Sequence, residues 1–311
     1  MIDYLIPPIP PLSTSYKEQI TKLRDCYKSP FIKMDEFFGN IFTEFLRKWR
    51  GITGPLPKPE KWCFIVGCTN SGNTLFQELL SHHPDIGTMP GEGEFYTDQF
   101  KRARDLNLGR GYALDKDKFY LDEKSGKEID LEKLKRQWGA KFDDPSKPVL
   151  LEKTPANTVR VRWLQEHFKD PHFIGIVRNG YAVAEGIRRK RGFPLDIASK
   201  QWLKSNRILL EDFKRLNKTM IIKYENLAEN TKETLIDVAE FIGLDTENFD
   251  IEDLMDRSYS IHEKDSSIKN MNHRSFKSLS SDDFRLIRQI TGEMLDKFDY
   301  EDELEKYLSK N

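Results

Sequence analysis

A loop of small and polar residues is the first segment of this sequence whose composition suggests chemistry. GCTNSGNT at 67–74 lies between an apolar run and a stretch of helical period. A strand, a small-residue loop and a helix N-terminus gather backbone N–H groups at the positive end of a helix dipole, which predicts an anion cradle. Gly67 and Gly72 would let a ligand approach the backbone, and the Ser71 and Thr74 hydroxyls could bond the same oxygens. An ordinary strand-to-helix turn is the alternative interpretation.

One position in this loop argues against an ATP-dependent kinase. The P-loop pattern G-x-x-x-x-G-K-[ST] requires a lysine that reaches the β- and γ-phosphates. The sequence keeps the spacing from Gly67 to Thr74 but has Asn73 where that lysine belongs. The loop therefore suits a phosphate that is bound and is not transferred through a lysine at this point.

Four short apolar runs predict the strands that would position the loop. They are WCFIV at 62–66, PVLLE at 148–152, HFIGIV at 172–177 and MIIKY at 220–224. Stretches of helical period follow them at 73–82, 157–168, 181–191 and 228–243. Strands that are apolar on both faces and alternate with helices are typical of a parallel sheet covered on both sides. The predicted fold class is α/β with three layers, a central parallel sheet flanked by helices.

The remaining patterns predict how the chain is divided. The expected segments are an N-terminal arm and helix packing on the core over 1–60, a main domain over 61–311, and a polar insertion in that domain at about 105–146. Within the first segment, 34–49 has helical spacing after a proline-rich start. The C-terminal stretch 281–309 is predicted as helix, with Ser280 or Ser281 as its N-cap.

Charge and cysteine content exclude several classes of protein. The 311 residues include 50 Lys and Arg against 51 Asp and Glu, so no global basic field would attract nucleic acid or a membrane. Any bound anion must therefore be held by a local site. Three cysteines (Cys26, Cys63 and Cys68) are too few for a disulfide framework and fit a reducing compartment. Without a membrane-length apolar run or a signal-peptide pattern, we expect a cytoplasmic protein.

Five segments, taken in order, resemble the motifs of one enzyme family. GCTNSGNTLF and the later His83-Pro84 are similar to a G-x-P-R-S-G-T-T-L-L loop and the H-P that ends its helix. EKTP at 152–155 resembles E-K-[ST]-P, and FIGIVRNGYAVAEGIRRK at 173–190 resembles I-V-R-D-G-R-A-V-x-x-S. IIKYENLAENTKETLIDVAEFIGL and SFKSLSSDDFRLIRQITGEMLDKFDY resemble the last two motifs. The family is the sulfotransferases, including protein-tyrosine, carbohydrate and bacterial members, and the match spans roughly 62–300.

This resemblance implies a P-loop-like fold and a specific donor. Family members transfer the sulfuryl group of 3′-phosphoadenosine 5′-phosphosulfate (PAPS) to a hydroxyl or amine, release the 3′,5′-bisphosphate (PAP), and require no metal. The implied cofactor-binding residues are Ser71, Gly72, Asn73 and Thr74 at the 5′-phosphate, Arg178 at the 3′-phosphate, and Arg274 and Lys277 in a loop that closes over the latter. A surface salt bridge is the simpler interpretation of Arg178.

Two positions depart from the family pattern. Asn70 stands where the family has an Arg or Lys that contacts the bridging oxygen, and Gly186 stands where it has a serine at the 3′-phosphate. Asn70 would still donate a neutral hydrogen bond to the cofactor. The lysine that corresponds to Lys153 lies beside the sulfate in protein-tyrosine and heparan-type members. We therefore expect Lys153 to stabilise the charge that develops on the transferring group.

The acceptor hydroxyl would need a general base, which the family often supplies after the first helix. The segment MPGEGEFY at 89–96 offers two carboxylates, Glu92 and Glu94. The alignment through His83-Pro84 favours Glu92 as the catalytic base. His82 and His83 are weaker candidates, since a helix end suits them to capping or packing.

Several assignments stay open at this level. The basic run Arg188 to Arg191 would line the anion site or form a solvated helix face, and Tyr224 would contact the nucleotide or pack in the core. A small-molecule kinase or a nucleotide-binding relic remain alternatives to a PAPS-dependent sulfotransferase. The acceptor would be a small molecule, a carbohydrate or a peptide. Residues 86–146 and the N-terminal arm would shape its pocket.

Overall fold

The structure is a computed structural model that describes residues 45–106, 108–256, 259–260, 265–266 and 268–300. The chain divides into two compact units, Met1–Lys48 and Trp49–Asn311. Residues 45–53 are helical, and the helix ends before Gly54 and the prolines that follow. The predicted arm and the first part of the predicted helix, up to residue 44, lie outside the described residues. No helix in the described ranges has the length and apolarity needed to cross a membrane.

A five-stranded sheet organises the second unit. Its strands are β1 (Lys61–Gly67), β2 (Ile86–Thr88), β3 (Val149–Lys153), β4 (Pro171–Val177) and β5 (Thr219–Lys223). Their order is β2-β3-β1-β4-β5, and every neighbouring pair is parallel. The four predicted strands are confirmed, as is the α/β class. The sequence did not reveal β2, because three residues without an apolar run carry no strand signal.

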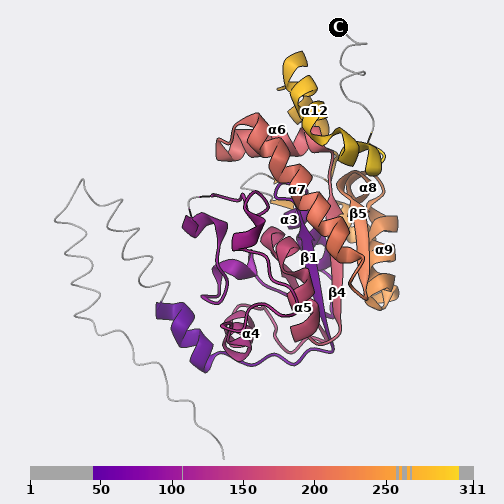
Figure 1. The fold of residues 1–311 in the computed structure, drawn as a ribbon. Coiled ribbons are helices and arrows are strands. Elements are labelled where there is room, and N and C mark those ends of the chain that lie inside the picture. Colours follow the sequence, from indigo (N-terminus) through magenta and orange to yellow (C-terminus); the bar gives the residue numbers. More distant parts are fainter. Residues whose placement is uncertain (1–44, 107, 257–258, 261–264, 267, 301–311) are drawn as a thin grey trace, which may run out of the picture. The chain divides into compact units, whose positions relative to one another are not determined.

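Helices cover both faces of the sheet (Figure 1). The α-helices are α3 (Asn73–Leu80), α4 (Leu131–Gly139), α5 (Val161–His167), α6 (Gly180–Arg191), α7 (Leu195–Phe213), α8 (Tyr224–Glu229), α9 (Thr231–Ile242), α10 (Ile251–Asp256), α11 (Asn272–Phe276) and α12 (Ser281–Lys297). Short 3-10 turns are η1 (Gly93–Phe95), η2 (Ala103–Leu106), η3 (Lys116–Lys118), η4 (Pro155–Val159) and η5 (Thr246–Asn248). The strands β6 (Tyr259–Ser260) and β7 (Asp265–Ser266) form an antiparallel pair.

The alternation of side chains along β1 divides the core in two. Trp62, Phe64 and Val66 point to one face, where they pack in a cluster with α4, α5, α6, α7 and α12. Cys63 and Ile65 point to the other face and pack with α3, α8, α9 and α10. All five side chains are at most 1% exposed. A strand buried on both faces is the signature of the three-layer α/β architecture, which is therefore confirmed.

Three helix predictions need correction, and one helix was not predicted. The predicted helix at 157–168 is the turn η4 followed by α5, because Pro155 begins a 3-10 turn. The predicted helix at 228–243 is two helices, α8 and α9, that meet at Asn230. The predicted C-terminal helix ends at Lys297, and 301–309 lie outside the described residues. The 19-residue α7 was missed altogether. The N-cap of α12 is Ser280, whose Oγ accepts the Asp283 N–H at 3.2 Å in a capping box.

The stretch at about 105–146 contributes to the core despite its polar composition. Tyr112, Leu134, Trp138 and Phe142 are each no more than 6% exposed. Tyr112 donates its hydroxyl hydrogen to the carbonyl of Gly67 at 2.9 Å, which ties this stretch to the end of β1. Parts of it therefore belong to the site.

Candidate active site

A cavity of about 370 Å³ lies at the edge of the sheet where the parallel strands end. The loop after β1 lines it, and so do Lys153 at the end of β3, Arg178 directly after β4 and Tyr224 directly after β5. Glu92, four residues beyond β2, completes the set. Parallel α/β sheets bind ligands at this edge, because every strand delivers its next residues to the same place.

Positive charge dominates the cavity lining. Its basic residues are Arg110, Lys153, Arg178, Arg189, Lys190, Arg191, Lys269 and Arg274. Within the described part of the chain, Glu92 is the single acidic residue that lines it. Eight cations against one carboxylate create a local anion site in a chain whose overall charge is close to neutral.

The loop after β1 has the geometry of an anion cradle. Gly72 is the N-cap of α3 with a φ of 99°, and a Cβ built there would lie 2.6 Å from Cδ2 of Tyr224. Only glycine fits this left-handed position beneath the Tyr224 ring. The side chain of Asn73 donates to the Cys68 carbonyl at 2.9 Å and closes the loop. No side chain caps the first N–H groups of α3 in the described residues, and this end of the helix lines the cavity.

The two departures from the family pattern are neighbours in space. A Cβ built on Gly186 would lie 3.7 Å from Nδ2 of Asn70, in ordinary van der Waals contact. Asn70 has a φ of 67°, and its Nδ2 is buried without a hydrogen-bond partner in the described residues. An unsatisfied buried donor beside an anion cavity is free to bind a ligand oxygen.

Arg178 is held by three elements. Its Nε donates to Oδ1 of Asn272 at 2.8 Å, and Nη1 donates to the Asn70 carbonyl at 3.1 Å. The guanidinium lies 4.1 Å from the centroid of the Tyr224 ring. Burial lowers the pKa of Arg178, although an arginine stays charged at any physiological pH. No acidic side chain forms a salt bridge with Arg178 in the described structure, so the surface salt-bridge interpretation does not fit.

The other expected cofactor residues differ in position. Thr74 and Arg274 are exposed and line the cavity. Ser71 is fully buried outside the lining, and its Oγ has no partner in the described residues. Lys277, at the end of α11, is exposed and does not line the cavity.

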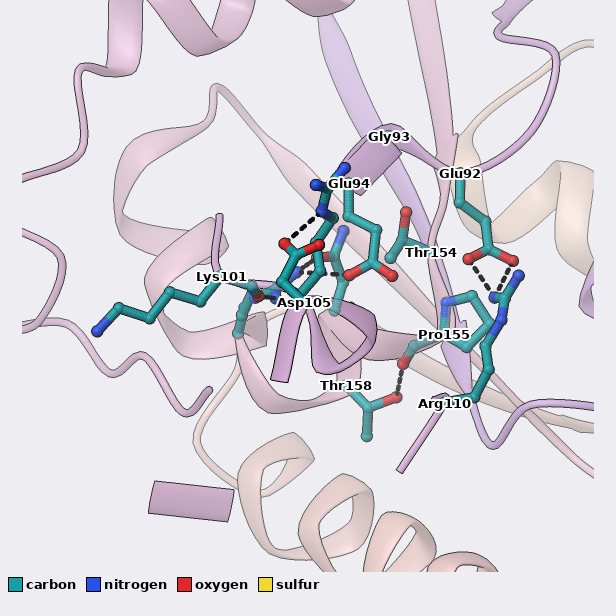
Figure 2. A network of polar contacts seen from close by, with 12 residues as sticks. Glu92, Gly93, Glu94, Lys101, Asp105, Arg110, Thr154, Pro155 and Thr158 are labelled. Atoms are coloured by element: carbon teal, nitrogen blue, oxygen red, sulfur yellow. Dashed lines mark hydrogen bonds and ion pairs between the residues drawn. The ribbon is translucent and has the colours of Figure 1, made fainter. Parts of the chain in front are cut away.

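The acidic end of the cavity holds Glu92, Arg110 and Lys153. Arg110 Nη1 contacts both carboxylate oxygens of Glu92, and the two side chains face each other in Figure 2. Nζ of Lys153 lies 3.8 Å from Oε1 of Glu92. Lys153 is 4% exposed, and burial lowers its pKa while the nearby Glu92 and Glu152 carboxylates oppose that change. The candidate base and the candidate electrophilic lysine therefore share one small space.

Glu94 lies in a separate environment. The chain turns through η1 directly after Glu92, and Glu94 is buried with its Oε2 3.5 Å from Arg160 Nη1. Burial is the main cause that raises the pKa of Glu94. The two carboxylates point to different partners because the chain enters a 3-10 turn between them, whereas on an extended chain residues two apart would lie on the same side. Only Glu92 lines the cavity.

Comparisons with known proteins agree with this geometry. Residues 63–248, more than half of the chain, match the sulfotransferase family, and residues 198–306 match a sulfotransferase domain. This chain belongs to the sulfotransferase family. No curated protein matches the sequence.

Two solved structures show the same fold in other members. The sulfotransferase domain of the Synechococcus PCC 7002 olefin synthase is 19% identical, with a TM-score of 0.50, over 79% of this chain and 96% of that one. Sulfotransferase STF9 from Mycobacterium avium is 14% identical, with a TM-score of 0.50, over 84% of this chain and 82% of that one. At these identities the likeness supports the fold alone.

In this sulfotransferase, a buried carboxylate positions the segment that carries Glu92. Oε1 of Glu152 accepts the Gly93 N–H at 2.9 Å and the Thr154 hydroxyl, and Oε2 accepts the Asn157 amide at 2.7 Å. On the other side, Trp138 Nε1 donates to the Gly93 carbonyl at 3.0 Å. Because Gly93 is fixed at both its N–H and its carbonyl, the preceding Glu92 has a defined position.

Glu152 should make the stability of this sulfotransferase depend on pH. Burial raises the pKa of its carboxyl from about 4.5 to about 7, against three hydrogen-bond donors. The unfolded chain releases the proton first, so we expect the free energy of unfolding to fall as pH rises through that range. Glu152→Gln should remove this dependence. Across this pH range, the decrease in the free energy of unfolding should be roughly 3 kcal/mol larger for the wild type than for the variant.

Urea unfolding of both proteins at the two ends of the range measures this effect. The amide of the variant accepts fewer hydrogen bonds than the carboxylate, so the variant also loses stability that does not depend on pH. The comparison is therefore between the pH dependences of the two proteins and not between their absolute stabilities. Parallel pH dependences would contradict a carboxyl with a raised pKa at this position.

The sequence interpretation overlooked Arg110, Lys269 and Met271. Arg110 stands between two glycines in the stretch interpreted as an insertion, and that G-R-G tripeptide was the available signal for an arginine on a tight turn. Of the basic run, Arg188 pairs with Asp283 at 3.1 Å, and the next three residues line the cavity. His83 is a packing residue, with its Nε2 3.1 Å from the Asp245 carbonyl.

Proposed function

We propose that this protein transfers the sulfuryl group of PAPS to a hydroxyl or amine of an acceptor. The observation that carries the proposal is the cavity at the strand ends, where, among the described residues, eight basic side chains surround a single carboxylate. A cavity of this charge suits a donor with several phosphate and sulfate groups. A carboxylate beside a buried lysine suits proton removal from an acceptor.

The residues present fit PAPS. The N–H groups at the start of α3, with Gly72, Asn73 and Thr74, would hold the 5′-phosphate. Arg178 and the exposed Arg274 would hold the 3′-phosphate. The buried Nδ2 of Asn70, which lacks a partner within the described residues, would gain one from a donor oxygen.

Two further residues would assist donor binding less directly. Ser71 would support the loop from its buried side, since its hydroxyl lies outside the cavity lining. Lys277 would contribute only longer-range attraction from the exposed end of α11.

Glu92 and Lys153 would carry the chemistry at the acceptor. PAPS supplies an activated sulfuryl group whose leaving group is PAP. Glu92 would accept the proton of the acceptor hydroxyl on a carboxylate oxygen. Lys153, 3.8 Å from that carboxylate and 4% exposed, would offer a positive charge with little competition from water. The function therefore rests on two neighbouring groups with opposite charge.

The acceptor class is a small molecule, carbohydrate or peptide, since each offers a hydroxyl or amine. A reducing compartment, and with it a cytoplasmic location, fits Cys63 and Cys68, which are both buried and free. Burial also raises the pKa of the Cys68 thiol to about 12, so this cysteine in the loop is not a nucleophile.

Isothermal titration with PAP tests the donor site without knowledge of the acceptor. We expect micromolar binding by the wild-type protein, little affinity for Mg²⁺–ATP, and a loss of about a hundredfold or more in Arg178→Ala. The loss follows because Arg178 is fixed between Asn70 and Asn272 and would place its charge on the 3′-phosphate.

Arg285→Ala is the matched control. Arg285 lies on α12, pairs only with the exposed Asp282 in the described structure, and is outside the cavity. It should bind PAP like the wild type. Binding of Mg²⁺–ATP without PAP binding would contradict the proposal and favour a kinase. PAP binding without transfer to any acceptor would favour a nucleotide-binding relic.

A further inference from the structure

The cavity carboxylate is engaged by an arginine that the donor-binding motifs do not contain. Arg110 Nη1 contacts both oxygens of Glu92, whereas Lys153 approaches only one of them, at 3.8 Å. The pair is neither fully buried nor freely exposed, with 22% of the Arg110 side chain and 11% of the Glu92 side chain accessible. Arg110 is therefore the more accessible of the two cations that form ion pairs with Glu92.

Arg110 is held in place by the fold. Two residues later, the buried Tyr112 donates to the Gly67 carbonyl at 2.9 Å and pairs with the Ser205 hydroxyl at 2.9 Å. On the other side, Gly109 has a φ of +54° and packs against the Phe193 ring. The guanidinium also lies 5.4 Å from the centroid of the Phe95 ring. Because its neighbours on both sides are anchored to buried residues, the fold fixes the position of Arg110.

The basic residues of the cavity extend from the side assigned to the donor phosphates to Glu92. Lys190 interacts electrostatically with Arg189, Arg178, Arg191 and Arg274. Arg191, the last residue of α6, also interacts with Arg110 and Glu92. Together with Lys153, Arg110 and Arg191 place three cations around one carboxylate. This set keeps a net positive charge after Glu92 is counted.

This arrangement leaves Glu92 without a free oxygen for an acceptor hydroxyl. Arg110 engages both carboxylate oxygens, so a hydroxyl can approach one of them only after that contact opens. A neutral acceptor would leave the pair intact, and both Glu92 oxygens would stay engaged. An acceptor that carries its own carboxylate would offer Arg110 an equivalent partner, and the positive charge of Arg191 would attract it.

We propose that the acceptor bears a carboxylate near the hydroxyl to be modified, and that Arg110 exchanges Glu92 for that carboxylate. The exchange replaces one carboxylate–guanidinium pair by another, so no hydrogen bond is lost overall. The released Glu92 then accepts the hydroxyl proton on a carboxylate oxygen. Arg110 is thus a specificity-determining residue that couples recognition of an acidic acceptor to release of the base. This inference rests on the proposed function.

Binding to the PAP-saturated protein tests the exchange by titration. The probes are 4-hydroxyphenylacetate against 4-hydroxyphenylacetamide, and a methyl glucuronide against its uronamide, so that each pair keeps its shape while a carboxylate is replaced by a neutral amide. We expect at least one acid to bind about tenfold or more tightly than its amide, and Arg110→Gln to abolish that preference. Arg191→Gln, at an exposed position, should reduce the preference severalfold. This variant keeps the test decisive if Arg110→Gln fails to fold.

Arg285→Gln removes an equal charge on α12, outside the cavity, and should keep the full preference. Equal binding of acid and amide in both pairs, including no binding of either, overturns the inference while PAP binding keeps the proposed function. A preference that survives both Arg110→Gln and Arg191→Gln also overturns it. Failure of PAP itself to bind overturns the proposed function, and the inference falls with it.

Discussion

Lys153→Met is expected to lower the rate of sulfuryl transfer by about 10²- to 10³-fold while PAP still binds. Lys153 ends β3 beside the cavity, and its ammonium group is 3.8 Å from Glu92 in a place where little water competes. The loop position at which the family pattern has a cation holds Asn70, which carries no charge. Lys153 would therefore stabilise most of the negative charge that develops during transfer.

Methionine suits this test because it fills a similar volume without the charge. Single-turnover transfer from labelled PAPS measures the rate, and titration with PAP shows whether the donor site is intact. Lys297→Met, an exposed change in the last turn of α12, is the control and should transfer at the wild-type rate. A loss of less than about threefold in Lys153→Met would remove Lys153 from the proposed chemistry.

The predicted residues that meet at the cavity lie next to strong local patterns. The loop after β1, Lys153 and Arg178 each follow an apolar run long enough to be recognised as a buried strand. Because parallel strands end at the same edge, strand prediction alone brings these distant residues together. Glu92 was ranked above Glu94 by its alignment with the family, and Glu92 is the one that lines the cavity.

Other features depend on contacts that no local pattern encodes. The buried face of α7 includes polar residues such as Ser199, Gln201 and Asn206, which dilute the apolar periodicity by which helices are recognised. Arg110 lies in a polar stretch, and its contacts with Glu92 and the Tyr112–Gly67 hydrogen bond, which bring this stretch to the cavity, join residues far apart in the sequence.

On the donor side, no local sequence pattern showed that Asn70 and Gly186 are close together. They are distant in the sequence, and each by itself looked like a lost function. In the structure they are adjacent, with 3.7 Å between the Asn70 amide and a Cβ built on Gly186. The two departures therefore change one corner of the cavity together, where a glycine leaves room beside an unpaired amide donor.

Glu92→Gln is expected to reduce transfer by about 10²- to 10⁴-fold, the usual range for loss of a general base. Glutamine keeps the shape but cannot accept the hydroxyl proton. Because Glu92 is the single acidic residue lining the cavity within the described chain, its neutralisation leaves more positive charge there. PAP should therefore bind at least as tightly as to the wild type.

An acceptor that is already ionised separates loss of the base from loss of structure. At mildly alkaline pH 4-hydroxy-3-nitrophenylacetate is largely a phenolate and needs no proton removal, whereas 4-hydroxyphenylacetate does. The variant should therefore lose far less activity with the nitro compound than with 4-hydroxyphenylacetate. An equal loss with both would mean that Glu92 positions the acceptor and is not the base.

Glu94→Gln provides the comparison two residues away. Glu94 is buried against Arg160, 3.5 Å from it, and does not line the cavity, so this variant should keep transfer but unfold more easily. If Glu94→Gln abolished transfer in folded protein while Glu92→Gln retained it, the two carboxylates would exchange roles. The Arg110–Glu92 pair would then be a structural salt bridge at the cavity rim.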